Sequence, residues 1–207
     1  MNQEEIVNLF QSRQPSIQGL EGLQKFAVLL PLVRVNGELE VLFEVRSEHL
    51  RKQPGEICFP GGKIERTDET PGAAAIRETA EELQIDQKAV TRLLPLDYVV
   101  SSFGNRVVYP YFGFLEHSEF HPNPDEVEEI FTIPLAYLMK IEPECYRLQF
   151  HVEPEQAFPF HLIRGGKAYK WNTQQMTEYF YYYGDYVIWG LTAGILKNFI
   201  DILKTGL

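Results

Sequence analysis

The segment 61–85 restricts the fold of this 207-residue chain more than any other part of it. It opens with a Gly-Gly pair and continues into a run with helical spacing. Thr70 is a suitable N-cap, and Pro71 suits the first helical position, where its missing N–H would be unpaired anyway. We therefore expect a helix that begins near Pro71 and ends near Leu83 or Gln84.

One side of this predicted helix is apolar and the other is acidic. At about 100° per residue, the apolar stripe consists of Ala73, Ile76, Ala80 and Leu83. Glu78, Glu81 and Glu82 share the opposite arc. The stripe should pack on a sheet, while like charges one turn apart cost a few tenths of a kcal/mol per pair. A solvated face paired with Arg77 and nearby lysines would offset this repulsion, and so would a bound Mg²⁺ or Mn²⁺. The helix alone leaves both alternatives open.

The flanking segments predict a mixed sheet. Asn36-Gly37 separates two apolar, β-branched runs, 25–35 and 38–46, and is typical of a hairpin turn. Further strands are expected at 90–100, 106–115, 146–152 and 160–164, with a turn at Gly104-Asn105. Helices are expected at 4–10, within 133–139 behind Pro134, and at 187–204. This order predicts an α/β fold in which helices flank a mixed sheet.

The helix and the turn before it resemble the Nudix box, G-x5-E-x7-R-E-U-x-E-E-x-G-U with U aliphatic. The positions that match are Glu69, Arg77, Glu78, Glu81, Glu82 and Ile85. Three positions depart from the pattern. Six residues instead of five separate Gly62 from Glu69, Thr79 occupies an aliphatic place, and Gln84 replaces the glycine.

A longer run upstream is similar to the motif of the coenzyme A pyrophosphatase subgroup, L-L-T-x-R-S-x3-R-x3-G-x3-F-P-G-G. This chain reads LFEVRSEHLRKQPGEICFPGG, with Arg46, Ser47, Arg51, Gly55, Phe59, Pro60, Gly61 and Gly62 at the required spacing. Phe43 and Glu44 replace the second leucine and the threonine. The segment VIWGLTAGILKNFI near the C-terminus is similar to a helix of the same subgroup.

The resemblance implies a Nudix-type α/β/α sandwich with N-terminal and C-terminal helices. It also implies hydrolysis of the diphosphate of coenzyme A or its derivatives to 3′,5′-ADP and 4′-phosphopantetheine, with Mg²⁺ or Mn²⁺ as cofactor. Glu78 and Glu82 are the implied metal ligands, and Glu81 is either a further ligand or the base. Arg77 would orient a box glutamate. Arg46, Arg51, Gly61 and Gly62 are the expected substrate contacts.

Two alternatives remain open beside this reading. The same chemistry would serve another substrate, such as ADP-ribose, a dinucleotide or a damaged nucleotide. A domain that binds a nucleotide without cleaving it belongs to a different class, but such domains usually lose box glutamates, and this chain keeps Glu78, Glu81 and Glu82. The resemblance also allows a homodimer, by analogy alone.

Other polar residues give weaker signals. Glu126 lies where many Nudix proteins supply a late glutamate to the metal, although an exposed acidic loop is an equally good reading. Lys52 could contact phosphate. The cluster 179–183, rich in tyrosine, could stack on an adenine, but packing on the C-terminal helix is favoured. Cys58 is expected to be a buried small residue, and the five histidines show no ligand spacing.

Whole-chain properties exclude some function classes. The net charge of −10 argues against a general nucleic-acid binder. No apolar run approaches the roughly 20 residues of a membrane helix. Two cysteines and an N-terminus without a signal pattern favour the cytoplasm. We expect one domain over 1–207, with its core at about 25–204 and a helical extension at 1–24.

Overall fold

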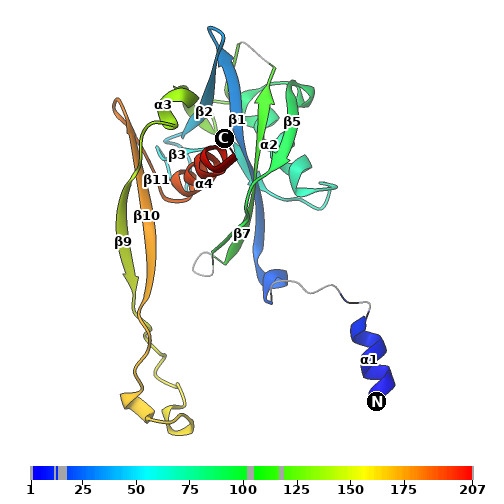
Figure 1. Cartoon of the computed structure of the whole chain (residues 1–207), viewed down its shortest axis with the longest axis vertical. Helices are drawn as coiled ribbons and strands as arrows, with labels where there is room; N and C mark the ends of the chain where they lie inside the picture. The colour runs from blue at the N-terminus through cyan, green and yellow to red at the C-terminus, as the bar shows by residue number, and fades with distance from the viewer. Residues whose placement is uncertain (1, 12, 14–17, 102–104, 117–118, 207) are drawn as a thin grey trace.

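A mixed β-sheet with a helix on each face forms the centre of the protein (Figure 1). The computed structural model describes residues 2–11, 13, 18–101, 105–116 and 119–206. Its helices are α1 (Gln3–Gln11), α2 (Pro71–Leu83), α3 (Leu135–Leu138) and α4 (Gly190–Gly206), with 3₁₀ turns η1 (Leu20–Gly22), η2 (Gln87–Ala89), η3 (Phe160–Leu162) and η4 (Gly166–Ala168). Its strands are β1 (Gln24–Val35), β2 (Glu38–Arg46), β3 (Ile57–Cys58), β4 (Gly61–Lys63), β5 (Val90–Pro95), β6 (Val99–Ser101), β7 (Arg106–Leu115), β8 (Val127–Pro134), β9 (Glu144–Phe150), β10 (Gln174–Tyr183) and β11 (Tyr186–Trp189).

Strand β1 is the centre of the larger sheet, whose order is β3-β2-β1-β7-β5. β1 pairs antiparallel with β2 and parallel with β7, so the sheet is mixed as predicted. The hairpin between β1 and β2 is confirmed. Asn36 and Gly37 both have positive φ, 50° and 90°, as the two-residue turn of a tight hairpin requires.

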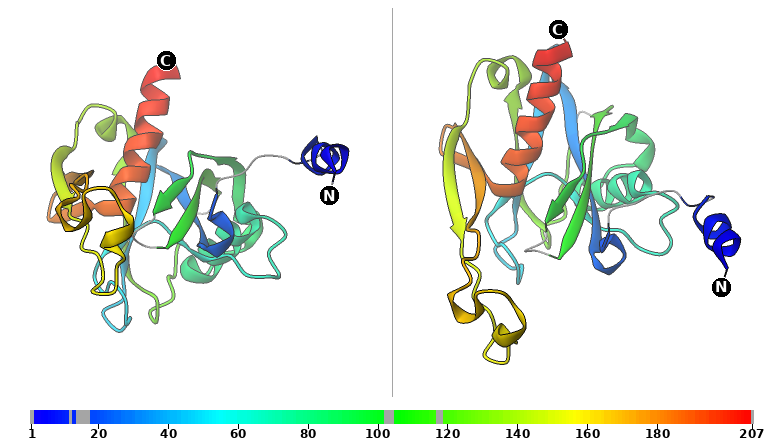
Figure 2. Two further views of the ribbon diagram at one scale, coloured as in Figure 1. Left: turned by 90° about the horizontal axis from the view of Figure 1, so that it is seen from below. Right: turned by 60° about the horizontal axis from the view of Figure 1, so that its bottom comes forward.

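The two faces of this sheet are covered by different helices (Figure 2). Leu30 and Leu32 of β1 belong to a core cluster with Leu196 of α4. Ala27 and Leu29, which alternate with them, belong to a second cluster with Leu83 of α2 and further residues of that helix. Because successive side chains of a strand point to opposite faces, a helix–sheet–helix sandwich results. The predicted fold class is confirmed.

Helix α2 begins at Pro71 as predicted, and the hydroxyl of Thr70 accepts the N–H of Ala73 at 3.1 Å. It ends at Leu83, followed by Gln84 in the left-handed conformation. Of the predicted apolar stripe, Ala80 and Leu83 belong to the core cluster and Ile76 packs against it, whereas Ala73 is only half-buried and does not. The buried residues are Gly72, Ala74, Ala75, Thr79, Ala80, Glu82 and Leu83. The buried face is thus rotated toward the acidic side and includes one glutamate.

Several predicted elements need correction. The strand expected at 90–100 is interrupted between Pro95 and Val99 and forms β5 and β6. The acidic segment after Pro124 contains strand β8, which was not predicted, whereas the short helix expected behind Pro134 is present at Leu135–Leu138. The stretch 160–164, expected to be extended, contains the 3₁₀ turn η3. Gly104 lies outside the described residues.

The C-terminal third forms a second sheet in the order β11-β10-β9, which was also not predicted. The helix expected from Val187 starts at Gly190, whose φ is +63°, and residues 186–189 are strand β11. The tyrosine cluster lies on β10, where Tyr181 is buried in the α4 core cluster. The hairpin of β9 and β10 extends away from the central sheet (Figure 1).

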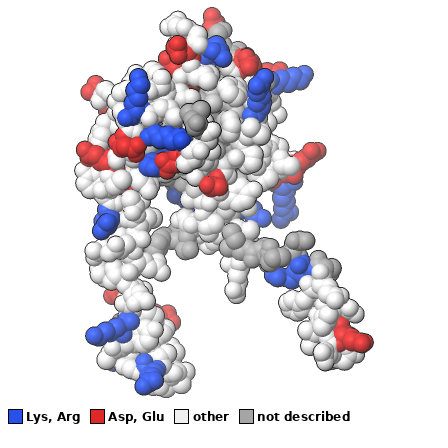
Figure 3. Space-filling view, in the orientation of Figure 1, with Lys and Arg blue, Asp and Glu red and all other residues white. Residues whose placement is uncertain are grey.

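On the face shown in Figure 3, acidic and basic side chains are interspersed. Within the described ranges, no helix is long and apolar enough to cross a membrane. None of the residues of α1 is buried.

Candidate functional site

The larger sheet opens beneath α2. The ladder between β1 and β2 ends at the pair Leu32 and Val41. Beyond this pair, β1 continues with β4 as its neighbour, and β2 continues with β3. The short link between β3 and β4 is held to β1 by the N–H of Leu29, which donates to the carbonyl of Pro60 at 2.9 Å. The sheet therefore places the Gly-Gly turn directly beneath the acidic helix.

Gly61 and Gly62 contact two of the three predicted carboxylates. The N–H of Gly61 donates to Oε2 of Glu82 at 2.8 Å. A Cβ on Gly62 would lie 2.4 Å from Cδ of Glu78. A Cβ on Gly61 would lie 2.4 Å from the carbonyl oxygen of Ala27, and the φ of Gly61 is +151°. The turn thus requires glycine at Gly61 to lie against β1 and at Gly62 to lie against Glu78 of the helix.

Arg77 connects the helix to the loop before it. Its Nε and one terminal nitrogen donate to the two carboxylate oxygens of Asp68, both at 3.0 Å. The other terminal nitrogen donates to Glu78 at 2.9 Å and to Glu81 at 3.2 Å. The hydrogen bonds from Arg77 lower the pKa of Asp68. Arg77 is therefore placed to orient Glu78 and Glu81.

Asp68 was not among the predicted site residues. Glu69 matches the early box glutamate, yet Glu69 is exposed and its neighbour Asp68 forms the ion pair with Arg77. The signal available in the sequence was the extra residue between Gly62 and Glu69, which shifts the register of the loop. Glu81 is more open than its partners, with a side chain 55% exposed.

Two glutamates, one on helix α2 and one on strand β2, have buried side chains. Glu82 of α2 is 5% exposed and Glu44 of β2 is 1% exposed. Burial, with smaller contributions from the charges of Glu78 and Glu126, raises the pKa of Glu82 to about 8, although the Gly61 hydrogen bond opposes this. Burial first, then the charge of Glu82, raises the pKa of Glu44 well above its ordinary value. Sequence reasoning did not single out Glu44 as a site residue.

The loop before β8 brings Glu126 to the same place. The N–H of Asn123 donates to the carbonyl of Glu82 at 2.8 Å, and the N–H of Ser47 donates to the carbonyl of Glu126 at 2.9 Å. The charge of Glu126 contributes to the raised pKa values of Glu78 and Glu82. Glu126 is half-buried, so the reading of a merely exposed acidic loop does not describe it.

The predicted substrate contacts lie at different depths. Arg46 is half-buried beside the carboxylates, and within the described part of the chain its buried Nε has no hydrogen-bond partner. Arg51 and Lys52 are exposed in the loop between β2 and β3. Burial raises the pKa of the Cys58 thiol, which does not favour a nucleophilic role.

The donor chemistry of the site fits a divalent cation, although the ligands are not preassembled. Among the residues that the structure describes, no three His, Cys, Asp or Glu side chains are grouped closely enough to hold a metal. Arg77 forms ion pairs with Glu78 and Glu81, and the carboxylate of Glu82 accepts the N–H of Gly61. Buried carboxylates that repel one another need a cation or protons, and carboxylate oxygen is the ligand that Mg²⁺ and Mn²⁺ prefer. Side-chain rotation would have to complete the shell.

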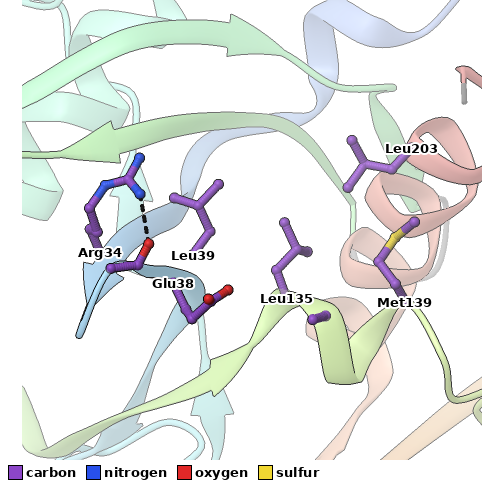
Figure 4. A pocket seen from close by; sticks show the side chains of 8 residues that line it. Arg34, Glu38, Leu39, Leu135, Met139 and Leu203 are labelled. Carbon is purple, nitrogen blue, oxygen red and sulfur yellow. Dashed lines mark hydrogen bonds between the residues drawn. The ribbon is translucent and has the colours of Figure 1, made fainter.

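A largely apolar cleft of about 480 Å³ lies elsewhere, at the turn end of the β1–β2 hairpin (Figure 4). Its lining residues are Arg34, Gly37, Glu38, Leu39, Leu135, Ala136, Met139 and Leu203. Arg34 donates to the carbonyl of Gly37 at 2.8 Å. Asn36 is eight residues along the chain from Val28, where Gly61 pairs, so roughly 26 Å of strand separates this cleft from the carboxylates.

Comparison with known proteins identifies the family. A model of the NUDIX domain matches residues 24–148. The chain is 32% identical over 201 residues to the Nudix hydrolase NudL of Klebsiella pneumoniae, covering 96% of this chain and 93% of that protein. It is 41% identical over 126 residues to the mouse peroxisomal coenzyme A diphosphatase NUDT7, covering 59% of this chain and about half, 51%, of that protein.

A solved structure agrees at the level of the fold. The MutT/nudix family protein from Enterococcus faecalis superposes with a TM-score of 0.52 at 15% identity, over 99% of this chain and 70% of that one. The range matched by the NUDIX domain model, residues 24–148, contains the Gly-Gly turn, the helix with its carboxylates and the opened sheet. The chain belongs to the Nudix family of hydrolases.

Proposed function

We propose that this Nudix hydrolase cleaves the diphosphate of coenzyme A or its derivatives, using Mg²⁺ or Mn²⁺. The products would be 3′,5′-ADP and 4′-phosphopantetheine or an acyl form of it. One observation carries the proposal. The coenzyme A pyrophosphatase motif that starts at Leu42 ends in Gly61 and Gly62, and these glycines lie against Glu82 and Glu78. The printed name of the mouse relative is consistent with this substrate.

The metal would be held by Glu78 and Glu82, with Glu81 as a further ligand or as the base. When bound, a divalent cation shields the phosphate oxygens and lowers the pKa of the attacking water. The chain itself supplies the positioning. Arg77, fixed by Asp68, orients Glu78 and Glu81, while Gly61 orients Glu82 by a backbone hydrogen bond. Glu81 is exposed enough to receive a proton from water and release it to solvent.

The substrate phosphates would approach from the side of Arg46 and Arg51. Arg46 is half-buried, and its guanidinium would pair with a phosphate oxygen. Arg51 lies in an exposed loop and would contact the outer part of the substrate. The carboxylates around Arg46 make this part of the site negative. The guanidinium of Arg46 would therefore supply the positive charge that an anionic substrate needs there.

A substrate panel tests the proposal. Purified protein is incubated with Mg²⁺ or Mn²⁺ and, in parallel, with coenzyme A, ADP-ribose, NADH or a diadenosine polyphosphate, and products are identified by mass. We expect 3′,5′-ADP from coenzyme A at the highest kcat/KM of the panel. A higher kcat/KM for another diphosphate would reassign the substrate, and binding without any product would reassign the protein to a nucleotide-binding role.

Location and assembly belong to the same proposal. We infer a reducing compartment such as the cytoplasm, which the two free cysteines Cys58 and Cys145 support.

We also infer a single domain over 1–207 that forms a homodimer, supported by the exposed apolar side chains of the β9–β10 hairpin, among them Tyr146, Leu148 and Met176. Light scattering should then give twice the 24.0 kDa mass of the chain.

A further inference from the structure

Glu44 is a buried carboxylate with one oxygen that lacks a hydrogen-bond partner. The residue is 1% exposed, and its buried Oε1 atom has no hydrogen-bond partner among the residues that the structure describes. The coenzyme A pyrophosphatase motif has threonine at this place, so the carboxylate is a departure of this chain from the motif. Burying an unpaired carboxylate is costly, so a chain that keeps one there needs something to offset the cost.

The strand geometry directs Glu44 toward the metal-binding helix. Leu42, two residues earlier on β2, belongs to the core cluster beneath α2, and side chains two apart on a strand share a face. Glu44 is also the cross-strand partner of Cys58. Gly61, three residues after Cys58, donates its N–H to Glu82. The carboxylates of Glu44 and Glu82 therefore flank the same short link between β3 and β4.

The neighbours of Glu44 add negative charge to it. Glu82 from α2 and Glu126 from the loop before β8 repel its carboxylate, and Arg46 of the same strand attracts it. Arg46 offsets this repulsion only in part, because the pKa of Glu44 stays well above its ordinary value and its Oε1 has no hydrogen-bond partner among the described residues. A cation between Glu44 and Glu82 would satisfy the free oxygen and reduce the repulsion together.

We propose that Glu44 is an additional carboxylate of the metal centre in this chain, binding a divalent cation held by Glu82 either directly or through a metal-bound water. The inference rests on the proposed metal-dependent function. It extends the ligand set from the helix to the opposite wall of the site, strand β2. Glu44 and Glu82 would hold the cation from opposite walls of the site, and the cation would supply the positive charge that these buried carboxylates lack.

Metal binding, measured apart from catalysis, tests this. Mn²⁺ affinity of the full-length protein is measured by electron paramagnetic resonance, with the Mn²⁺-induced shift in Tm as a second readout. Glu44→Gln keeps the size of the side chain, and Glu44→Thr introduces the residue of the motif. Both should weaken Mn²⁺ binding about tenfold or more and reduce the Tm shift at a fixed Mn²⁺ concentration. The metal-free Tm should not fall in Glu44→Gln, because a buried charge has been removed.

Glu40→Gln is the matched control. Glu40 lies on the same face of β2, four residues away, and is hydrogen-bonded to Thr132. This variant should bind Mn²⁺ like the parent protein. Mn²⁺ affinities of Glu44→Gln and Glu44→Thr within twofold of the parent would overturn the inference. If Glu82→Gln weakens Mn²⁺ binding and the Glu44 variants do not, the metal centre is retained but Glu44 is not part of it. A parent protein that binds no Mn²⁺ would overturn both the inference and the proposed function.

Discussion

At the scale of single residues, Gly61 and Gly62 are adjacent, yet a side chain at each would meet a different kind of neighbour. At Gly61 the new Cβ would meet backbone atoms of β1, which cannot move without the strand. At Gly62 it would meet the carboxylate of Glu78, the free end of a flexible side chain. The absence of a side chain at Gly61 therefore serves the packing of the sheet, whereas at Gly62 it serves the position of a proposed metal ligand.

Alanine at the two positions should separate these roles. We expect Gly61→Ala to lower the free energy of unfolding by about 3 kcal/mol, because backbone clash and a positive φ act together. Gly62→Ala should change the stability by less than about 1 kcal/mol while lowering kcat/KM at least about 100-fold, because Glu78 is displaced. Urea unfolding and steady-state kinetics on both variants measure this. Equal stability losses at the two positions would contradict the assignment.

Asp68 and Glu69 offer a second contrast between neighbours. Asp68→Asn keeps one acceptor oxygen for Arg77 but removes the charge, so we expect a loss of roughly 0.5–1 kcal/mol, in the range of partly exposed ion pairs. Glu69→Gln, at the exposed neighbour, should leave the stability unchanged within about 0.3 kcal/mol. Thermal unfolding of both variants decides. A larger effect at Glu69 would mean that the box glutamate itself holds Arg77.

At the scale of elements, the sequence predicted the bounds of α2 because its signals are local. Thr70, Pro71 and the spacing of the glutamates lie within a few turns of one another. The buried face was predicted less well, because it depends on how the helix rests on the opened sheet. Thr79 looks polar in the sequence, but it is fully buried and its hydroxyl donates to the carbonyl of Ala75 at 2.7 Å.

Replacing that threonine tests the packing of the helix. The hydroxyl bond to Ala75 adds to a carbonyl that the helix already uses, and such bonds slightly destabilise helices. Thr79→Val has a similar shape and is aliphatic, as the Nudix box specifies here. We expect it to raise the free energy of unfolding by up to about 1 kcal/mol, measured by urea titration, with kcat unchanged. A loss above about 1 kcal/mol would show that the hydroxyl is required.

At the scale of the whole molecule, the parts that the sequence did not predict are long-range. Strand β8 reads as an acidic segment behind two prolines and becomes a strand only by pairing with β2. The second sheet joins β9 to β10 across 23 intervening residues, from 151 to 173. Glu44 lies at the site only because of how the strands pair, which motif spacing does not show. Motif spacing predicted the carboxylates of α2, whereas the opposite wall required the folded sheet.

The concentration of buried carboxylates also affects global stability. Glu44 and Glu82 are nearly inaccessible and repel each other, so a cation that binds only the folded chain should stabilise it. At a metal concentration of 100 times Kd, the gain is about 2.7 kcal/mol. We expect Mg²⁺ or Mn²⁺ to raise the Tm relative to protein in EDTA. KCl at the same ionic strength, without a divalent cation, should not raise the Tm. An unchanged Tm would argue against a metal centre.

The most direct measurement of the central claim is the release of 3′,5′-ADP from coenzyme A by three proteins under identical conditions. These are the parent, Glu82→Gln, and Glu38→Gln, whose exposed carboxylate lies at the turn end of β2. We predict 3′,5′-ADP release by the parent and by Glu38→Gln in Mg²⁺ or Mn²⁺, its loss in EDTA, and a decrease of at least about 100-fold in Glu82→Gln. Full activity of Glu82→Gln, or no 3′,5′-ADP from the folded parent, would contradict the account.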